Sequence, residues 1–201
     1  SNLDEFQPLK NVPGVQLVWA REVAQLQGAH WVILPGSKHT SSDLAWMRQH
    51  GLDQAVMAHA QAGGAVLGIC GGLQMLGEAL IDPHGIDGNG AGLGLLPLVT
   101  QFALDKQVQR TESRFANVQG PWSALSGVTV QGYEIHHGQT DVHPAMRASG
   151  HAAQEVLPGL GWQNESGRVM GLYLHGLFEN ASVLQALFGQ QARTLDQVFD
   201  A

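Results

Sequence analysis

The chain has a single cysteine, Cys70, and the residues around it are typical of a reactive thiol. The apolar run 65–69 predicts a buried strand, and three small residues flank the thiol, namely Gly68, Gly71 and Gly72. Small neighbours permit the sharp strand-to-helix turn, called a nucleophile elbow, that exposes a nucleophile at the carboxyl edge of a sheet. The helix that follows begins directly after Cys70, and the positive end of its dipole favours the thiolate form of the sulfur. The pattern predicts a nucleophile rather than a buried structural cysteine.

A thiolate nucleophile needs a base that deprotonates it and later protonates a leaving group. His175 is the best candidate, because it ends the apolar run 168–174 and is followed by Gly176. A histidine that leaves a parallel strand emerges at the same carboxyl edge as the elbow, where the active sites of α/β sheets collect. We therefore expect His175 to act on Cys70.

Acyl transfer also needs donors for a developing oxyanion. The elbow geometry offers the backbone N–H of Gly71, the residue after the nucleophile. A second donor is expected from the strand-end loop 35–38, where Gly36 lets the backbone turn its N–H toward the site. We expect Gly36 and Gly71 to form the oxyanion hole.

These side chains need a scaffold of alternating strands and helices. The sequence predicts strands at 15–19, 31–34 and before Cys70, with helices ending near Gln49 and spanning 54–61 between them. This alternation is typical of a parallel sheet covered by helices. Residues 82–92 form a loop rich in Gly and Asp. Further strands, several of them antiparallel, are expected at 100–104, 128–135, 152–156 and 168–174, with a last helix over 182–188.

Composition places the chain among single-domain globular proteins. It has 201 residues, of which 44% are hydrophobic and 13% charged, so we expect one α/β domain over 1–201. A net charge of −7 argues against binding to nucleic acid or anionic membranes. No apolar run approaches the roughly 18 residues of a membrane span, and no signal peptide is visible. The lone cysteine fits a reducing compartment, so a cytoplasmic location is expected.

Several ordered motifs resemble a known family. The elbow Gly68-x-Cys70-x-Gly72-x-Gln74, the preceding Pro-Gly-Ser loop and the late strand-end histidine are similar to class I glutamine amidotransferase domains. The similarity is greatest to the type found at the carboxyl end of cobyric acid synthases, and it extends to the motifs 92–97, 132–140 and 173–180. The resemblance implies a flavodoxin-like fold: a mostly parallel sheet with helices on both faces and some antiparallel strands.

The resemblance also implies a reaction and its partners. Cys70 would attack the side-chain amide of glutamine, His175 would protonate the departing ammonia, and water would hydrolyse the thioester. The ammonia would pass to an N-terminal ATP-dependent synthetase domain, which amidates adenosylcobyrinic a,c-diamide in cobalamin biosynthesis. This chain has no phosphate-binding Gly-x-x-x-x-Gly-Lys-Ser/Thr motif, so ATP and Mg are expected only in that other domain. The matching positions make Ser37, Gln74, Tyr133, Glu134 and His136 substrate-binding candidates.

One position departs from the usual class I pattern. Those domains carry a glutamate two residues after the catalytic histidine, where this chain has Leu177. Glu179 and Glu134 are the nearest acids that could replace it, although a preformed thiolate–imidazolium pair depends less on a third group than a serine does. A metal is not expected at His136 and its neighbour His137, because adjacent strand residues face opposite ways.

Three other functions remain open from the sequence. A glutaminase partner of a Mur-ligase-like cell-wall amidotransferase also lacks the usual acid, but the Pro-Gly-Ser-Lys loop and the Gly-Tyr-Glu-Ile-His strand argue against it. A catalytically silent α/β binding module is disfavoured by the intact Cys70 and His175. A related cysteine hydrolase or chaperone would carry an acid before the elbow rather than Gln74 after it.

Overall fold

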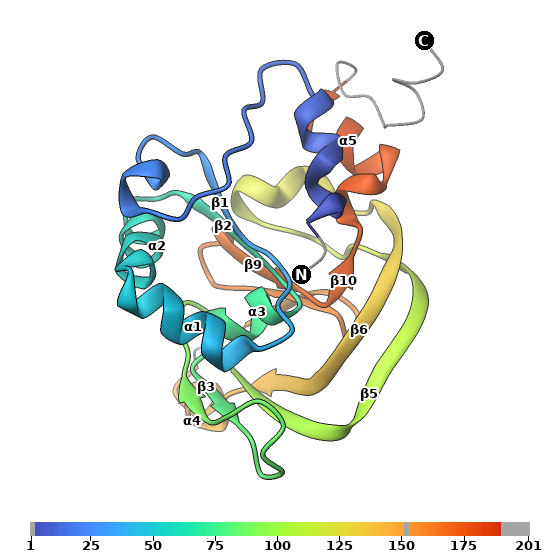
Figure 1. Ribbon diagram of the computed structural model, residues 1–201. Coiled ribbons are helices and arrows are strands. Elements are labelled where there is room, and N and C mark those ends of the chain that lie inside the picture. The colour runs from blue at the N-terminus through green and yellow to red at the C-terminus, as the bar shows by residue number, and fades with distance from the viewer. Residues whose placement is uncertain (1–2, 151–152, 190–201) are drawn as a thin grey trace.

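The computed structural model describes residues 3–150 and 153–189 and arranges their strands in two sheets (Figure 1). The first sheet contains three parallel strands, to which two antiparallel strands are added. In spatial order its strands are β1 (Trp31–Leu34), β2 (Ala65–Ile69), β9 (Val169–Leu172), β8 (Gly161–Gln163) and β7 (Gln154–Leu157). Ile69 pairs with Leu172, so β2 and β9 end side by side at the same edge.

The second sheet is dominated by a long curved pair of antiparallel strands, which crosses the lower right of Figure 1. In spatial order it contains β10 (Leu174–His175), β6 (Thr129–Val142), β5 (Leu98–Arg114), β3 (Ala79–Ile81) and β4 (Gly90–Ala91). Only Tyr173 separates β9 from β10. The chain therefore leaves the first sheet and joins the second within one residue, which carries it from the edge beside β2 directly to His175.

Helical segments cover both faces of the parallel strands. Leu34 of β1 contacts Gly72 on one face, whereas Trp31 points the other way and packs against Trp122 and Phe188. The α-helices are α1 (Thr40–Gln49), α2 (Leu52–Gln61), α3 (Gly71–Leu76), α4 (Pro144–Ala148) and α5 (Ala181–Phe188). The 3-10 helices are η1 (Asp4–Asn11), η2 (Val23–Leu26), η3 (Gly120–Leu125) and η4 (Leu177–Glu179).

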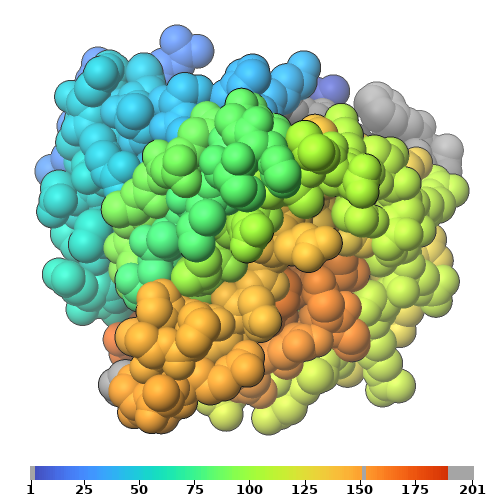
Figure 2. Space-filling view, turned by 90° about the horizontal axis from the view of Figure 1, so that it is seen from below, coloured from blue at the N-terminus to red at the C-terminus, as the bar shows by residue number. Residues whose placement is uncertain are grey.

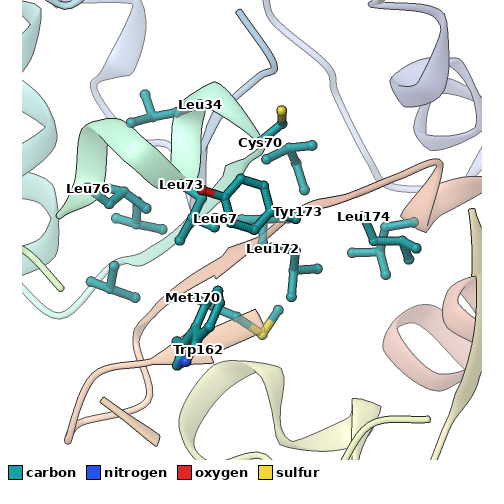
Figure 3. Close-up of a cluster of buried hydrophobic side chains, with 14 of the residues drawn as sticks. Leu34, Leu67, Cys70, Leu73, Leu76, Trp162, Met170, Leu172, Tyr173 and Leu174 are labelled. Atoms are coloured by element: carbon teal, nitrogen blue, oxygen red, sulfur yellow. The ribbon is translucent and has the colours of Figure 1, made fainter. Parts of the chain in front are cut away.

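The core lies between α3 and the central strands β2 and β9. Leu67, Leu73 and Leu172 are almost completely buried there, as Figure 3 shows. Cys70 lies at the border of this cluster, and its sulfur points away from the apolar side chains in the same view. The buried strands therefore fix the position of the thiol while its reactive atom faces the edge of the sheet.

The structure confirms the α/β class and most of the expected elements. The segment 82–92, expected as a loop, ends in the short strand β4, whose Gly90 and Ala91 pair with β3. Two further expectations differ. Residues 15–19 form no strand: Val15 and Leu17 pack against the core as their alternation requires, but the segment pairs with no described strand. Antiparallel pairing is more extensive than expected, and the parallel part of the first sheet is confined to β1, β2 and β9. The strand expected at 152–156 is β7, which spans Gln154–Leu157. Residue 152 lies outside the described residues.

The loop 82–92 supports the active-site edge from outside. Asp87 accepts hydrogen bonds from the backbone nitrogens of Thr40 and Ser41, at 2.9 and 2.7 Å, and so caps the first turn of α1. Asp82 is buried and accepts from three backbone N–H groups of the same loop. Figure 2 shows this green segment on the surface between α1 and the orange segment that contains α4. The loop thereby fixes where α1 begins, directly after the Pro-Gly-Ser-Lys loop.

Candidate active site

Cys70 occupies a strained strand-to-helix turn. Its φ of 53° and ψ of −106° make it the only non-glycine residue with positive φ among the described residues. Such a conformation costs on the order of 1–3 kcal/mol and is concentrated at functional sites. The turn also needs Gly72, where a Cβ atom would lie 2.0 Å from the carbonyl oxygen of Leu34. The expected nucleophile elbow is therefore present.

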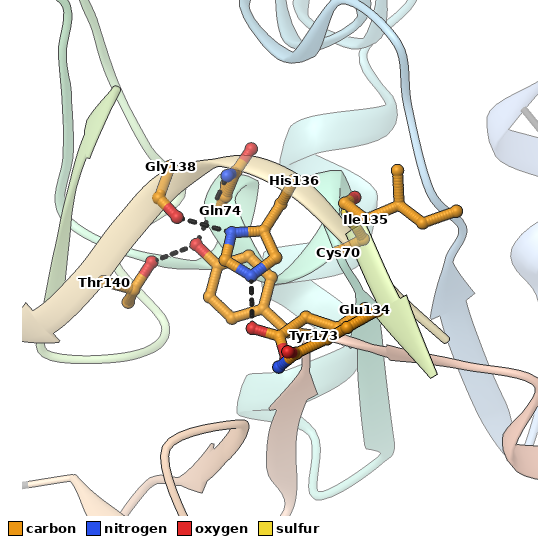
Figure 4. A network of polar contacts seen from close by, with 9 residues as sticks. Cys70, Gln74, Glu134, Ile135, His136, Gly138, Thr140 and Tyr173 are labelled. Atoms are coloured by element: carbon orange, nitrogen blue, oxygen red, sulfur yellow. Dashed lines mark hydrogen bonds and ion pairs between the residues drawn. The ribbon is translucent and has the colours of Figure 1, made fainter. Parts of the chain in front are cut away.

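The thiol of Cys70 faces β6 as well as the edge of the first sheet. Its Sγ lies 3.1 Å from the carbonyl oxygen of Ile135 and donates a hydrogen bond to it (Figure 4). Cys70 is 6% exposed, so little of the residue contacts solvent. The Ile135 carbonyl accepts from the protonated thiol, whereas a thiolate requires a positively charged partner, and His175 is the neighbouring group that can carry this charge.

His175 interacts with Cys70 and with a buried carboxylate. Burial opposes a positive charge on the imidazole, but hydrogen bonds to Cys70 and Glu5, together with the negative charge of both groups, raise the pKa of His175 to about 10. The structure thus brings together the two residues that the sequence nominated as nucleophile and base. The arrangement favours the imidazolium form of His175, which places a positive charge beside the sulfur of Cys70.

The acid beside His175 is Glu5, which the sequence analysis did not select. Its Oε2 lies 2.8 Å from Nδ1 of His175, whereas Glu179 and Glu134 have other neighbours. The carboxylate of Glu179 lies beside Gly176, and that of Glu134 contacts His136. Glu5 and His175 are 170 residues apart, so no local motif links them. An acid just before the apolar Phe6 was the only signal in the sequence.

The loop that follows β1 passes directly over the elbow. A Cβ atom on Gly71 would lie 2.9 Å from the backbone nitrogen of Ser37, and a Cβ atom on Gly36 would lie 2.7 Å from Cε1 of His175. Gly71 begins α3, so its N–H has no acceptor in the preceding helical turn. The Ser37 hydroxyl donates to Asp43 and accepts from the backbone nitrogen of His39, which stabilises the loop. The backbone nitrogen of Ser37 therefore lies beside Gly71, the residue that follows Cys70.

Tyr133 lies on the same sheet face as His175, because the two residues are paired across β6 and β10. Tyr133 is half exposed, its hydroxyl accepts a hydrogen bond of 3.0 Å from Arg110, and the guanidinium lies 5.2 Å from its ring centroid. A tyrosine and an arginine thus border the face of the sheet that carries the imidazole.

The other three substrate-binding candidates belong to a buried polar network (Figure 4). Gln74 receives a hydrogen bond of 2.9 Å from the Thr40 hydroxyl, and its amide nitrogen donates to the Tyr173 hydroxyl at 3.3 Å. Both ends of the Gln74 amide are therefore engaged inside the protein. Burial raises the pKa of Tyr173 to about 12, against the opposing effect of its hydrogen bonds, so this phenol stays protonated.

Glu134 and His136 form the other half of this network, on the opposite face of β6 from Ile135. The Nε2 atom of His136 lies 2.8 Å from the Glu134 carboxylate, and the imidazole stacks on Tyr173 with 3.8 Å between ring centroids. Both residues line a cavity of about 260 Å³. The structure therefore separates the five candidates: Ser37 and Tyr133 lie beside the Cys70–His175 pair, whereas Gln74, Glu134 and His136 lie together behind it.

The described residues, 3–150 and 153–189, contain no group of three or more His, Cys, Asp or Glu side chains that could hold a metal ion. Within the same ranges no helix is both long and apolar enough to cross a membrane. The groups that could take part in a reaction at this site are the Cys70 thiol, the His175 imidazole and backbone N–H groups of the loop after β1.

Comparison with known sequences identifies the family. Residues 1–183 match the CobB/CobQ-like glutamine amidotransferase domain. The chain belongs to this family. Among the relatives of this amidotransferase domain, the cobyric acid synthases of Acidovorax sp. (strain JS42) and Polaromonas naphthalenivorans are 68% and 69% identical to it. Each match covers 100% of this chain but only 41% and 42% of the relative. The chain thus spans about two fifths of the length of these curated relatives.

Solved structures show the same fold at low sequence identity. A glutamine amidotransferase has a TM-score of 0.63 at 17% identity and covers 96% of this chain, with 94% of its own length matched. PurLQS from Thermotoga maritima has a TM-score of 0.66 at 18% identity, with 92% of this chain and 90% of that chain covered. The relatives and the fold agree on a glutamine amidotransferase domain. They do not favour the silent module or the cell-wall partner.

Proposed function

We propose that this amidotransferase domain is the glutaminase part of a cobyric acid synthase. The observation that carries the proposal is the contact of the strained elbow thiol, Cys70, with the imidazole of His175, in a chain 60–69% identical to cobyric acid synthases. Glutamine is the substrate of the site, and ammonia is the product handed on.

The proposed reaction begins with attack of the Cys70 thiolate on the side-chain amide carbon of glutamine. The carbonyl oxygen becomes an oxyanion, and the backbone N–H groups of Gly71 and of the loop at Gly36 and Ser37 stabilise it. Collapse of the intermediate breaks the C–N bond, and the imidazolium of His175 gives its proton to the departing ammonia. His175 then takes a proton from water, whose oxygen attacks the thioester carbon. Glutamate leaves and the thiolate is restored.

The position of the candidates suggests different roles in substrate binding. Ser37 and Tyr133 can reach a substrate at the thiol, since they lie on the loop and the sheet face beside it. Gln74 is held at both ends by Thr40 and Tyr173, so in this conformation it supports the elbow helix from behind. We propose that Glu134 and His136 stabilise the strand whose Ile135 carbonyl meets Cys70.

The relatives extend beyond the region that this chain matches by about three fifths of their length, and we propose that this part is the synthetase. That part would bind ATP and Mg and would amidate carboxylates of adenosylcobyrinic a,c-diamide with the ammonia made here. We expect the isolated chain to hydrolyse glutamine slowly. Glutamate release should increase when the remaining part, ATP and the corrinoid acceptor are supplied together.

A diazo-ketone analogue of glutamine tests the assignment of the thiol. Intact-mass analysis should find one adduct per chain, and peptide mapping should place it on Cys70. Glutamine should protect against the adduct, whereas asparagine, one methylene shorter, should not. Labelling that glutamine does not slow, with equal reactivity toward a generic alkylator, would leave only a reactive cysteine and would disprove the glutaminase proposal.

A further inference from the structure

The carboxylate of Glu5 accepts hydrogen bonds from two consecutive residues, His175 at the end of β10 and Gly176 directly after it. Oε2 accepts from Nδ1 of His175 at 2.8 Å, and Oε1 accepts from the backbone nitrogen of Gly176 at 3.1 Å. Gly176 has a φ of 90°, a conformation that suits glycine. Glu5 is 3% exposed, so the carboxylate is buried and both oxygens are engaged. A buried carboxylate requires partners of this kind.

The helix that carries Glu5 is fixed to the segment that follows His175. Phe6 and Leu9 are buried, and the Phe6 ring lies 6.1 Å from that of Phe178 in η4. Figure 1 shows the blue η1 beside the red η4 and α5, at the far side of the molecule from α1. The position two residues after His175 is Leu177, which provides no acid and is buried in the core.

We propose that Glu5 is the positioning acid of this site, which holds His175 in the orientation and protonation state that Cys70 requires, and that docking of η1 therefore controls whether the glutaminase site is complete. The inference rests on the proposed glutaminase function. Since Nδ1 donates to Glu5, the free nitrogen of a neutral imidazole is Nε2, which is the nitrogen able to accept the thiol proton. The negative charge also stabilises the imidazolium that results.

Two groups that can carry a negative charge interact with the imidazole of His175. Cys70 meets the imidazole from the elbow, and Glu5 meets it from η1. Glu179 lies beyond Glu5, and its pKa is raised by burial and then by the charges of Glu5 and Asp4. Glu5 is the carboxylate whose charge raises the pKa of His175, and it lies within hydrogen-bond distance of the ring.

Glu5→Gln tests the role with almost no change of shape. One end of the amide is a donor, whereas both groups that face Glu5 donate to it. The amide satisfies both only if Nδ1 becomes an acceptor, which places the proton of a neutral ring on Nε2 and prevents that nitrogen from accepting from Cys70. Glu179→Gln is the matched control, because it removes a neighbouring carboxylate of the same type.

The first measurement is the rate of Cys70 alkylation by iodoacetamide as a function of pH, which requires no glutamine. We expect Glu5→Gln to lower the rate near neutral pH by about tenfold or more, Glu5→Asp to retain part of it, and Glu179→Gln to stay within about threefold of the wild-type rate. With glutamine, Glu5→Gln should lower kcat on the order of 10²-fold and leave KM within about threefold. An unchanged alkylation profile in Glu5→Gln would overturn the proposal even if the glutaminase assay fails.

The second measurement uses the unaltered chain, in case the variants do not fold. Nitrogen-15 NMR of the His175 ring should show a proton on Nδ1 over the whole neutral range. A ring protonated only on Nε2 when neutral would contradict the role of Glu5. Phe6→Ala tests the docking of η1 without touching the imidazole. It should slow alkylation by a factor between those of Glu5→Asp and Glu5→Gln, whereas a wild-type rate would disprove the control by η1.

Discussion

Gly36 and His175 are in direct contact: a Cβ atom at position 36 would lie 2.7 Å from Cε1 of the imidazole and within 3.7 Å of both ring nitrogens. The loop after β1 therefore limits how far the ring can swing. With Glu5 on Nδ1 and Gly36 against Cε1, the imidazole is held from two sides. This contact assigns Gly36 a steric role in addition to any oxyanion contact.

Gly36→Ala is expected to displace the imidazole and lower glutaminase activity on the order of 10²-fold, because small misplacements of a catalytic group have effects of this size. The ring that must shift is also the partner of the buried Glu5 carboxylate, so the free energy of unfolding should fall by about 1–3 kcal/mol. Steady-state kinetics and urea denaturation measure the two effects. Gly90→Ala, where a Cβ atom meets nothing within 4 Å, is the control. A fully active Gly36→Ala would refute the steric role.

Cys70 should lower stability through its backbone conformation. A non-glycine residue at φ of 53° and ψ of −106° is strained, and Gly adopts this region without a Cβ clash. We therefore expect Cys70→Gly to be more stable than Cys70→Ala by about 1 kcal/mol, after the greater entropy of Gly in the unfolded chain is subtracted. Chemical denaturation of the two inactive variants provides the comparison. Equal stabilities would mean that the elbow stores no strain.

The raised pKa of His175 predicts how stability depends on pH. Its folded value of about 10 exceeds the ordinary 6.5, so the native state binds this proton more tightly than the unfolded chain does. The resulting stabilisation is complete below about pH 6.5 and is lost as the pH rises to about 10. Denaturation at several pH values should show that the difference in unfolding free energy between wild type and Glu5→Gln shrinks over this interval. A difference in unfolding free energy that does not depend on pH would contradict the conclusion that Glu5 raises the pKa of His175 in the folded state.

Tyr173→Phe tests the buried network behind the site. The change removes the oxygen that accepts from the Gln74 amide and also contacts Thr140. A buried amide without its partner costs about 1–3 kcal/mol, so the free energy of unfolding should fall by that amount. Tyr133→Phe is the matched control, because its half-exposed hydroxyl loses only the Arg110 contact and the change should stay within about 0.5 kcal/mol. Equal losses in both variants would show that the network adds no stability.

Local patterns in the sequence were sufficient to predict the elbow and the strand-end histidine. Glycines on both sides of Cys70 and a glycine after His175 specify backbone geometry within a few residues. The same reasoning identified β1, α1 and α2, whose apolar spacing and caps are local. It did not identify the coil at 15–19, because an alternating pattern also suits a segment that packs one side on the core without pairing.

Glu5 could not be found in this way, because its role depends on contact between the two ends of the domain. Glu179 was closer in sequence, but Gly176 turns the chain so that the acid from η1, rather than the one from η4, faces the imidazole. Likewise, the separation of Glu134 and His136 from Tyr133 depends on which face of β6 meets the Cys70–His175 pair. Strand alternation predicts that they differ, but not which side carries the thiol.

The solitary thiol has a consequence for oxidative damage. A thiolate stabilised by His175 reacts readily with peroxide to give a sulfenic acid, which a nearby second thiol normally captures as a disulfide. This chain has no second cysteine among its 201 residues. A thiol that captures this sulfenic acid as a disulfide must therefore come from outside this chain, before the side chain advances to the irreversible sulfinic state. The reactivity expected of Cys70 as a nucleophile thus makes its recovery from peroxide depend on thiols that this chain does not contain.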